Sequence, residues 1–323
     1  HGAEPGRHLP LTSTGLGRIG FPAGRVRARL CPMGSKKKDS AEGAPLSELL
    51  RLPHGAVDMA SLDARATPGY PGKGKEDAPV HTAGLGRRLS DLQEMLYAGG
   101  RAAPEVSPRV LVVLQGMDTS GKGGVIRHAI GLVDPQGVDL TSFKAPSEEE
   151  RKHHYLWRIR NALPRPGQIG IFDRSHYEDV LVVRVESLVP EDVWSTRYDE
   201  INEFEAGLVA EGYKLVKCML NVSFDEQKAR LAERLADPTK YWKYNPGDVD
   251  ARKKWPAYME AYAAALEKCN TEAAPWFVIP SDRKWYRNWA VAELLRETLA
   301  GMGLAWPAAD FDVAVEKKRV AQS

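Results

Sequence analysis

The chain has 323 residues, with 45 lysines and arginines against 43 aspartates and glutamates, which gives a net charge of +2 at pH 7. A chain of this length can bury one sizeable core and carry appendages. The balanced charge excludes a global basic field, so a polyanionic ligand would have to bind a local patch. No apolar run in the sequence approaches the length of a membrane span, and we expect no membrane partner.

The cysteines bear on the compartment. Cys31, Cys218 and Cys269 are odd in number and widely spaced. This pattern fits neither a disulfide framework nor a zinc motif. It favours a reducing compartment, and we expect a cytoplasmic protein.

Residues 1–80 differ in composition from the rest, because they are rich in glycine, proline, serine and charge. We expect an N-terminal extension that is largely disordered or draped on the core. A regular apolar period begins near Gly84, where Leu85, Leu89, Leu92 and Leu96 recur at helical spacing. This period predicts an amphipathic helix leading into a main domain over residues 81–305. Residues 306–323 would then form a C-terminal tail.

The next element is a strand that ends in a glycine-rich loop. Residues 110–114 are apolar and mostly β-branched, which is typical of a buried strand, and the letters GMDTSGKGG follow over residues 116–124. The glycines let backbone N–H groups face an anion, and Lys122 adds a point charge. A helix expected over residues 125–132 would direct its positive end at the same anion. The alternative is a chance glycine-rich turn with a solvated lysine.

Two residues of this loop depart from the common G-x-x-x-x-G-K-S/T pattern. Gly123 stands where Ser or Thr usually offers a hydroxyl to Mg²⁺, and Asp118 places a carboxylate where phosphate would be repelled. The two departures explain each other if Asp118 holds the metal, directly or through water. The expected phosphate contacts of the loop are Gly116, Met117, Thr119, Ser120, Gly121, Gly123 and Gly124.

A strand is expected over residues 138–143, and Ser147 with Glu150 forms a capping box that opens a helix to about residue 163. A further apolar strand over residues 167–173 ends at Asp173. In proteins with a phosphate loop, an aspartate at the end of a neighbouring strand helps to hold magnesium, so Asp173 is the second expected metal ligand. Arg174 would offer phosphate oxygens a planar bidentate donor. The alternative is a strand-end aspartate paired with its own neighbour.

The remaining pattern continues the alternation of strands and helices. A helical region is expected over residues 190–211, a strand over 213–221, a helix over 223–235 with a second capping box, a helix over 251–268, a strand over 276–280 and a helix over 284–299. This alternation predicts an α/β fold, with a central parallel sheet covered by helices on both faces. Ligands bind beyond the carboxyl ends of such strands, which is where the loop at Gly116 and Asp173 both lie.

Basic residues gather between the last two predicted strands. Arg230 and Arg234 lie four apart on one helix face, and Lys240 and Lys243 follow in a segment bounded by proline and glycine. We expect these four residues to belong to a helical lid over about residues 230–255 that closes over phosphates and excludes water. The alternative is an ordinary solvated charged helix.

Taken together, GMDTSGKGG and FDRSHYEDVLVVRV (residues 172–185) resemble the polyphosphate kinase 2 family. Its members are P-loop kinases that move phosphoryl groups between inorganic polyphosphate and nucleotides. The stretches SFKAPSEEE, HYLWRIR, DPTKYWKYNPGD and APWFVIPSDRKWYRNWAV also resemble the family, so the resemblance covers about residues 85–304. The letters HYEDVLVVRV are most similar to the subgroup that phosphorylates both AMP and ADP.

The resemblance implies a P-loop kinase fold and a polyphosphate:nucleotide phosphotransferase that acts on AMP, ADP or both by direct in-line transfer. It implies Mg²⁺, with Mn²⁺ as an alternative, adenine or guanine nucleotides, and a homo-oligomer (dimer or tetramer). Glu178 would position the acceptor or an additional metal. The nucleotide pocket would lie near residues 143–147, with Lys144, Pro146 and Arg127 as candidates. The expected catalytic set is Asp118, Lys122, Asp173, Arg174 and Glu178.

Other functions fit the same loop. An ATP-dependent small-molecule kinase would require ATP and ignore polyphosphate, and a nucleotide-switched binding protein would bind nucleotide without phosphorylating an acceptor. A nucleic-acid binder would use the basic lid, but no recognised motif supports it, so we expect no nucleic-acid partner. Four histidines (His128, His153, His154 and His176) invite a phosphohistidine intermediate. We favour direct transfer, because the loop can position donor and acceptor by itself.

Overall fold

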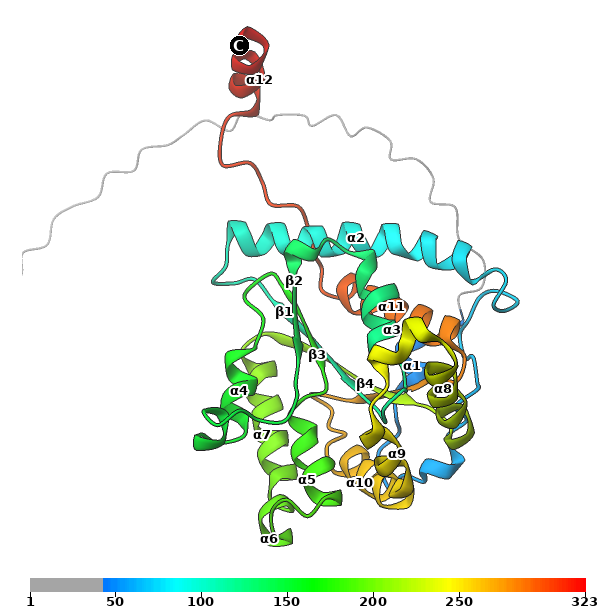
Figure 1. The fold of residues 1–323 in the computed structure, drawn as a ribbon. Helices are drawn as coiled ribbons and strands as arrows, with labels where there is room; N and C mark the ends of the chain where they lie inside the picture. The colour runs from blue at the N-terminus through cyan, green and yellow to red at the C-terminus, as the bar shows by residue number, and fades with distance from the viewer. Residues whose placement is uncertain (1–42) are drawn as a thin grey trace, which may run out of the picture. The chain divides into compact units, whose positions relative to one another are not determined.

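The structure is a computed structural model that describes residues 43–323. Its centre is a five-stranded parallel sheet with the strand order β2-β3-β1-β4-β5 (Figure 1). The strands are β1 (Arg109–Gln115), β2 (Val138–Ser142), β3 (Ile169–Asp173), β4 (Tyr213–Asn221) and β5 (Trp276–Pro280). Because β1 pairs with β3 in the register Leu114 to Asp173, the loop after β1 lies beside the turn after β3.

Helices cover both faces of this sheet (Figure 1). They are α1 (Leu46–Leu50), α2 (Ala78–Ala102), α3 (Lys122–His128), α4 (Leu156–Asn161), α5 (Val182–Val185), α6 (Glu191–Trp194), α7 (Arg197–Ala210), α8 (Phe224–Ala236), α9 (Pro246–Lys253), α10 (Trp255–Lys268), α11 (Lys284–Ala300) and α12 (Val313–Gln322). Successive side chains of a strand point to opposite faces of the sheet, so β1 contributes to two apolar layers, one on each face. Val110, Val112 and Leu114 pack with α2, α3 and α11. Leu111 and Val113 pack with α4, α7 and α10. The α/β fold predicted from the sequence is confirmed.

Two predicted helices differ from their expected extent. Ser147 and Glu150 do form the reciprocal capping box, with hydrogen bonds of 2.7 and 3.2 Å. The box opens only a 3₁₀ turn (Glu150–Lys152), because His153 is extended, and α4 begins afterwards. The helix expected over residues 125–132 begins earlier, at Lys122, and gives way to a 3₁₀ turn (Ile130–Leu132) after His128.

The second capping box is only half formed. The hydroxyl of Ser223 accepts from the N–H of Glu226 at 3.2 Å, as expected. The carboxylate of Glu226 does not reach back to Ser223, because it accepts from Arg230 instead. Asp282 takes its place and accepts from the N–H and the hydroxyl of Ser223, both at 2.9 Å. The start of α8 is therefore tied to the loop after β5.

Residues 46–77, which we call the N-terminal strap, pack against the main domain. Leu46 and Leu50 of α1 are buried in the core. The N–H of Leu52 donates to the carbonyl of Trp276 at 2.9 Å, along the edge strand β5. The ring of Tyr70 contacts Trp289 edge-on. Residues 1–42 of the expected extension lie outside the described residues.

The last segment of the chain includes α12, none of whose residues is buried. In residues 43–323, no helix is both long and apolar enough to cross a membrane.

Candidate active site

The loop after β1 is held in backbone conformations that favour glycine. Gly116 has φ +149° and Gly121 has φ +110°. A Cβ at Gly116 would lie 2.7 Å from the carbonyl oxygen of Leu220, so a side chain has no room there. Thr119 adopts φ +66° without being glycine, a conformation that costs energy in most residues. The loop is therefore a tight, fixed turn over the end of the sheet.

Lys122 lies inside this loop. It is the first residue of α3 and is 8% exposed. Its ammonium donates to the carbonyl oxygen of Gly116 at 2.7 Å. Burial lowers the pKa of Lys122, although the nearby carboxylates of Asp118, Asp173 and Glu178 oppose that effect. The charges of three carboxylates therefore act on this buried ammonium, so the predicted catalytic side chains lie in one region of the structure.

Several buried oxygen atoms of this site have no hydrogen-bond partner in the described residues. They are Oγ1 of Thr119, Oγ of Ser120, Oδ1 of Asp173 and Oε1 of Gln115. Unpartnered buried polar atoms are uncommon in folded proteins and mark places where a ligand, an ion or water completes the contacts. All four atoms belong to the loop after β1 or to the ends of β1 and β3, which are neighbouring strands.

The oxygen atoms of this site fit the ligand preference of a magnesium ion. Mg²⁺ prefers oxygen ligands and is usually held by one or two carboxylates, with water and substrate phosphates completing its shell. Asp173, with its unpartnered Oδ1, and Asp118 in the facing loop supply two carboxylates. Within residues 43–323, no group of three or more His, Cys, Asp or Glu side chains is arranged to hold a metal.

Arg174 joins the two halves of the site. Its guanidinium donates to Oδ1 of Asp118 at 2.7 Å, so it pairs across the strands instead of with its neighbour Asp173. Its backbone has φ +63°, another strained non-glycine residue at this edge. Burial opposes its charge, but Asp118, Glu178 and Asp173 outweigh burial and raise the pKa of Arg174. Arg174 therefore stays a cation beside the loop.

Glu178 follows in the turn after β3. Its Oε1 accepts from Nε2 of Gln115 at 3.1 Å, which places the carboxylate beside the end of β1. Burial raises the pKa of Glu178, and the opposing charges of Arg174 and Lys122 only reduce that effect. The site thus contains a second kind of carboxylate, one that holds its proton more tightly than an exposed glutamate.

The polyphosphate kinase 2 family model matches residues 77–304 of this chain. The chain belongs to the polyphosphate kinase 2 family. It is 48% identical over 255 residues to an AMP/ADP-polyphosphate phosphotransferase of Meiothermus ruber, covering 79% of this chain and 93% of the relative. It is 37% identical over 263 residues to an ADP-polyphosphate phosphotransferase of Rhodopseudomonas palustris, covering 78% and 88%.

A solved structure supports the same membership. The crystal structure of a polyphosphate kinase 2 from Arthrobacter aurescens TC1 is 48% identical and superposes with a TM-score of 0.83. It covers 87% of this chain and 98% of the other. The P-loop kinase fold expected from the family resemblance is therefore confirmed.

One residue expected in the lid of this family member lies elsewhere. Arg230 is buried behind the phosphate loop, and all five of its N–H donors are used. They donate to the carboxylate of Glu226 and to the backbone carbonyls of Thr119, Ser120, Ser281 and Asp282. No donor is left for a phosphate, so this placement corrects the expected role. The four-residue spacing showed that Arg230 and Arg234 share a helix face, but not that the first turns of this face pack against the loop.

The other basic residues of the expected lid are arranged around each other. Arg234 donates to Oδ2 of Asp248 at 3.1 Å and to the carbonyl of Lys243 at 2.8 Å. Lys240 is paired with Glu233 and Asp237, at 2.7 and 3.1 Å. Lys243 is exposed, and its ammonium lies 4.9 Å from the ring centre of Trp242. These contacts hold the segment after α8 together without enclosing Lys240 or Lys243.

The three expected nucleotide contacts belong to two different segments. Lys144 and Pro146 are exposed in the segment that follows the edge strand β2. Arg127 lies on α3 and lines a cavity of about 510 Å³ with residues of α2 and α11. Arg127 was a candidate because of the family resemblance, while its spacing from Lys122 was equally compatible with a solvent-facing side chain, and in the structure it is exposed on α3.

Two residues near the loop were not singled out from the sequence. Asp248, in α9, is 6% exposed, and burial together with the charge of Asp118 raises its pKa to about 6. It is thus a fourth carboxylate close to the loop, after Asp118, Asp173 and Glu178. Arg287, in the first turn of α11, donates to the carbonyl of Ser120 at 3.1 Å. Both lie within stretches that resemble the family, but neither stretch shows that its residues meet the loop.

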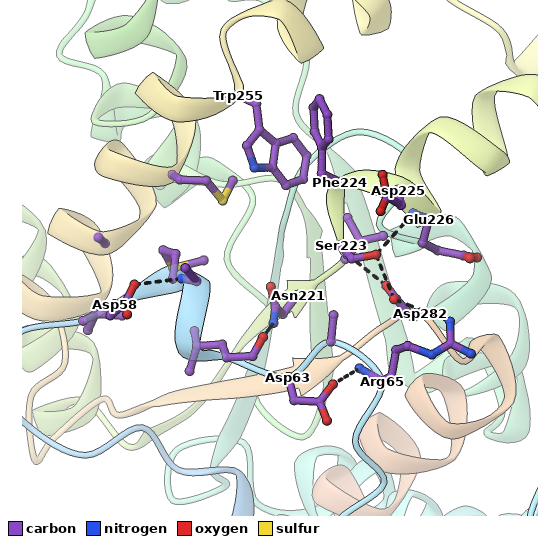
Figure 2. Close-up of a pocket in the computed structure, with 18 of the residues that line it drawn as sticks. Asp58, Asp63, Arg65, Asn221, Ser223, Phe224, Asp225, Glu226, Trp255 and Asp282 are labelled. Carbon is purple, nitrogen blue, oxygen red and sulfur yellow. Dashed lines mark hydrogen bonds and ion pairs between the residues drawn. The ribbon is translucent and has the colours of Figure 1, made fainter.

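A second cavity, of about 950 Å³, opens beside the start of α8, and Figure 2 shows Phe224 and Trp255 side by side on its wall. Its charged lining is Asp58, Asp63, Asp225, Glu226, Glu260 and Asp282, with Arg65 as the basic residue. This excess of carboxylates is unfavourable for a polyanion. The loop after β1 also has carboxylates nearby, but it adds the ammonium of Lys122 and the guanidinium of Arg174, so it is the one of the two regions that suits phosphate.

Four buried residues, which we call the inner network, hold the turn that follows β3 in place: His176, Tyr177, Glu205 and Lys217. This turn carries Glu178, and Asp173 is the last residue of β3. Lys217 is fully buried and donates to Glu205 at 2.6 Å, to Oη of Tyr177 at 2.8 Å and to the carbonyl of Cys269 at 2.7 Å. Tyr177 donates to Glu205 at 2.8 Å, and His176 contacts the same oxygen at 3.1 Å. Burial opposes the charge of Glu205, but Lys217 and His176 outweigh it and lower its pKa.

Proposed function

We propose that this chain transfers a phosphoryl group from inorganic polyphosphate to AMP and ADP. One observation carries the proposal: a buried lysine inside a strained glycine loop lies within electrostatic range of Asp118, Asp173 and Glu178 at adjoining strand ends. Relatives of the same family are named AMP/ADP- and ADP-polyphosphate phosphotransferases. Their names match the acceptors expected from the letters around Glu178.

In the proposed reaction, an oxygen of the acceptor's terminal phosphate attacks a terminal phosphorus of the donor, and the bond from that phosphorus to the rest of the donor chain breaks. Such transfer depends on positioning and charge stabilisation more than on covalent help from the protein. Lys122 and the N–H groups of the loop would bind the donor phosphates, and Arg174 would face the negative charge that develops on the transferred group.

Asp118 and Asp173 would hold Mg²⁺, or Mn²⁺ in its place, which neutralises phosphate charge when bound. Asp118 is already held by Arg174, so this carboxylate is oriented before the metal arrives. Glu178, whose pKa is raised by burial, would accept a hydrogen bond from the acceptor or hold an additional metal ion. The phosphate contacts we retain outside the loop are Arg234, Lys240 and Lys243.

Four finer points belong to the same proposal. The nucleotide would bind near Lys144 and Pro146, which follow the edge strand β2. Guanine nucleotides as further acceptors and a homo-oligomeric state rest on the family resemblance. A cytoplasmic location rests on the cysteine pattern, of which Cys218 and Cys269 are free buried thiols.

The proposal is tested by incubating the purified chain with Mg²⁺, polyphosphate and either AMP or ADP, and measuring ADP and ATP formation. We expect polyphosphate-dependent product with both acceptors, and none without the donor. Lys122→Ala should abolish nearly all turnover, whereas Arg109→Gln, which removes one charge at the opposite end of β1, should leave it unchanged. Phosphorylation of a small molecule by ATP alone, with polyphosphate ignored, would contradict the proposal and support a P-loop kinase of another substrate class.

A further inference from the structure

A buried arginine lies directly behind the phosphate loop. Arg287 is 3% exposed and donates from Nη1 to the carbonyl oxygen of Ser120 at 3.1 Å. A Cβ added at Gly121 would lie 1.8 Å from this Nη1, and one added at Gly124 would lie 2.4 Å from Nη2. The guanidinium therefore rests against the backbone on both sides of Lys122. At Gly124, whose φ is not positive, a larger residue would require this guanidinium to move.

Arg287 is unusual in its charge balance. Its Nε and Nη2 donate to Oδ1 of Asn288, at 3.2 and 2.9 Å, so its side-chain partner is a neutral amide. Among residues 43–323, no carboxylate forms an ion pair with Arg287, whereas its neighbour Arg230 is paired with Glu226 at 2.9 Å. Burial and the charge of Arg230 lower the pKa of Arg287 to about 9, and the carboxylate of Glu226, which is paired with Arg230, only reduces that effect. Arg287 therefore stays a cation at neutral pH.

A buried charge without an ion-pair partner is costly, because the protein interior replaces little of the hydration that the charge loses. A hydrogen bond to one carbonyl could be made by a neutral side chain. This cation lies against the backbone of the loop that is proposed to hold the donor. Its position indicates that bound donor phosphates offset the cost of burying the charge. Phosphates bound on the other side of the loop bring negative charge to the same place.

We propose that Arg287 is a positioning residue for polyphosphate: its unpaired buried charge, pressed against the backbone of Gly121 and Gly124, strengthens binding of the donor's phosphates to the loop. Arg287 does not touch the donor and acts through the loop and through its field. The inference rests on the proposed function only in that the loop is taken to hold the donor.

A merely structural role makes a different prediction. If Arg287 only holds the carbonyl of Ser120, a carboxylate beside it should be harmless or helpful. If its unpaired charge attracts the donor, a carboxylate should weaken donor binding while it stabilises the fold. Asn288→Asp makes this change, because Oδ1 of residue 288 already accepts two of the guanidinium's hydrogen bonds.

The experiment measures binding of inorganic polyphosphate of one chain length, with Mg²⁺ and without nucleotide, by titration calorimetry. Thermal unfolding without ligand is measured in parallel. Arg287→Gln should weaken binding about tenfold or more, and Arg287→Lys should recover most of this loss, because it restores the charge. Asn288→Asp should weaken binding several-fold and raise the melting temperature. Arg109→Gln, which changes the net charge by the same one unit far from the loop, should bind as the wild type does.

Unchanged polyphosphate binding in Asn288→Asp would overturn the inference, as would Arg287→Lys binding as weakly as Arg287→Gln. If Arg287→Gln does not fold, the lysine and aspartate variants still decide the question. A wild-type chain that binds polyphosphate but does not phosphorylate AMP or ADP would refute the proposed function and leave this test standing. A wild-type chain that binds no polyphosphate would overturn the inference itself.

Discussion

Two clusters of charged residues meet at the turn after β3, and they differ in what their charges contact. The outer cluster, formed by Asp118, Asp173, Arg174 and Glu178, is partly open to solvent and keeps an unpartnered oxygen on Asp173. In the inner network, all three N–H donors of Lys217 are used by protein groups, and the side chains of Lys217 and Glu205 are at most 1% exposed. Charge alone therefore does not mark a site in this protein. A functional site is marked here by accessibility to solvent and by polar atoms that lack a hydrogen-bond partner.

The largest expected effect comes from the outer cluster. Asp173→Asn keeps the size of the side chain but removes a metal-binding charge, so turnover should fall by about a thousandfold or more. The free energy of unfolding should change by less than about 1 kcal/mol, because Oδ1 has no protein partner to lose. Steady-state assays over a range of Mg²⁺ concentrations and urea unfolding measure the two quantities.

Asp139→Asn, the same substitution in β2, is the matched control and should leave both quantities unchanged. A large loss of stability in Asp173→Asn would mean that the outer cluster is structural and that the contrast with the inner network is wrong.

The inner network should behave in the opposite way. Lys217→Met leaves the carboxylate of Glu205 buried without its ammonium partner, which should cost about 3–5 kcal/mol of unfolding free energy. Removing both charges with Lys217→Met and Glu205→Gln should cost less than Lys217→Met alone, because no uncompensated charge remains. Urea unfolding of both variants measures the difference. Equal losses in the single and double variants would show that packing, and not charge, dominates the network.

The two arginines of α8 allow a closer comparison. Arg230→Gln removes donors to four backbone carbonyls behind the loop and should cost about 2–3 kcal/mol. Arg234→Gln breaks a partly exposed pair with Asp248 and should cost less than about 1 kcal/mol. If the order of these losses in urea unfolding were reversed, Arg230 would not be the anchor that its contacts indicate.

A smaller effect than that of Arg230→Gln concerns Asp248, whose pKa of about 6 lies above its ordinary value of 3.8. The folded state then binds this proton more tightly than the unfolded state, so Asp248 makes the protein less stable as the pH rises from about 4 to 6. Asp248→Asn should match the wild type near pH 4 and be more stable by about 1–2 kcal/mol at pH 7.5. Urea unfolding at both pH values measures this, and a less stable variant at pH 7.5 would contradict it.

The sequence predicted those parts of the molecule that local patterns determine. The bounds of β4 and β5 agree with the expected strands, and the loop with Lys122 lies beside Asp173, because both follow parallel strands. The roles of Arg230 and Arg287 depend on contacts across 110 and 167 residues of sequence, which no local spacing reveals. Lys217 is a local signal of the inner network, because it lies in the apolar strand β4 and a buried ammonium needs a carboxylate partner.

The N-terminal strap determines how far the chain can be truncated from its N-terminal side. The family match begins at residue 77, after the strap has already passed along β5. Yet the N–H groups of Leu46 and Ser47 donate to the carboxylate of Glu297 at 2.8 and 2.9 Å, and Asn221 at the end of β4 donates to the carbonyl of Leu62 at 3.0 Å. A shortened chain that started at residue 77 would expose the edge strand β5. An exposed edge strand can pair with a strand of another molecule, so we expect this shortened chain to aggregate. We therefore expect the smallest stable unit to begin about thirty residues before the segment that matches the family, at the start of the strap.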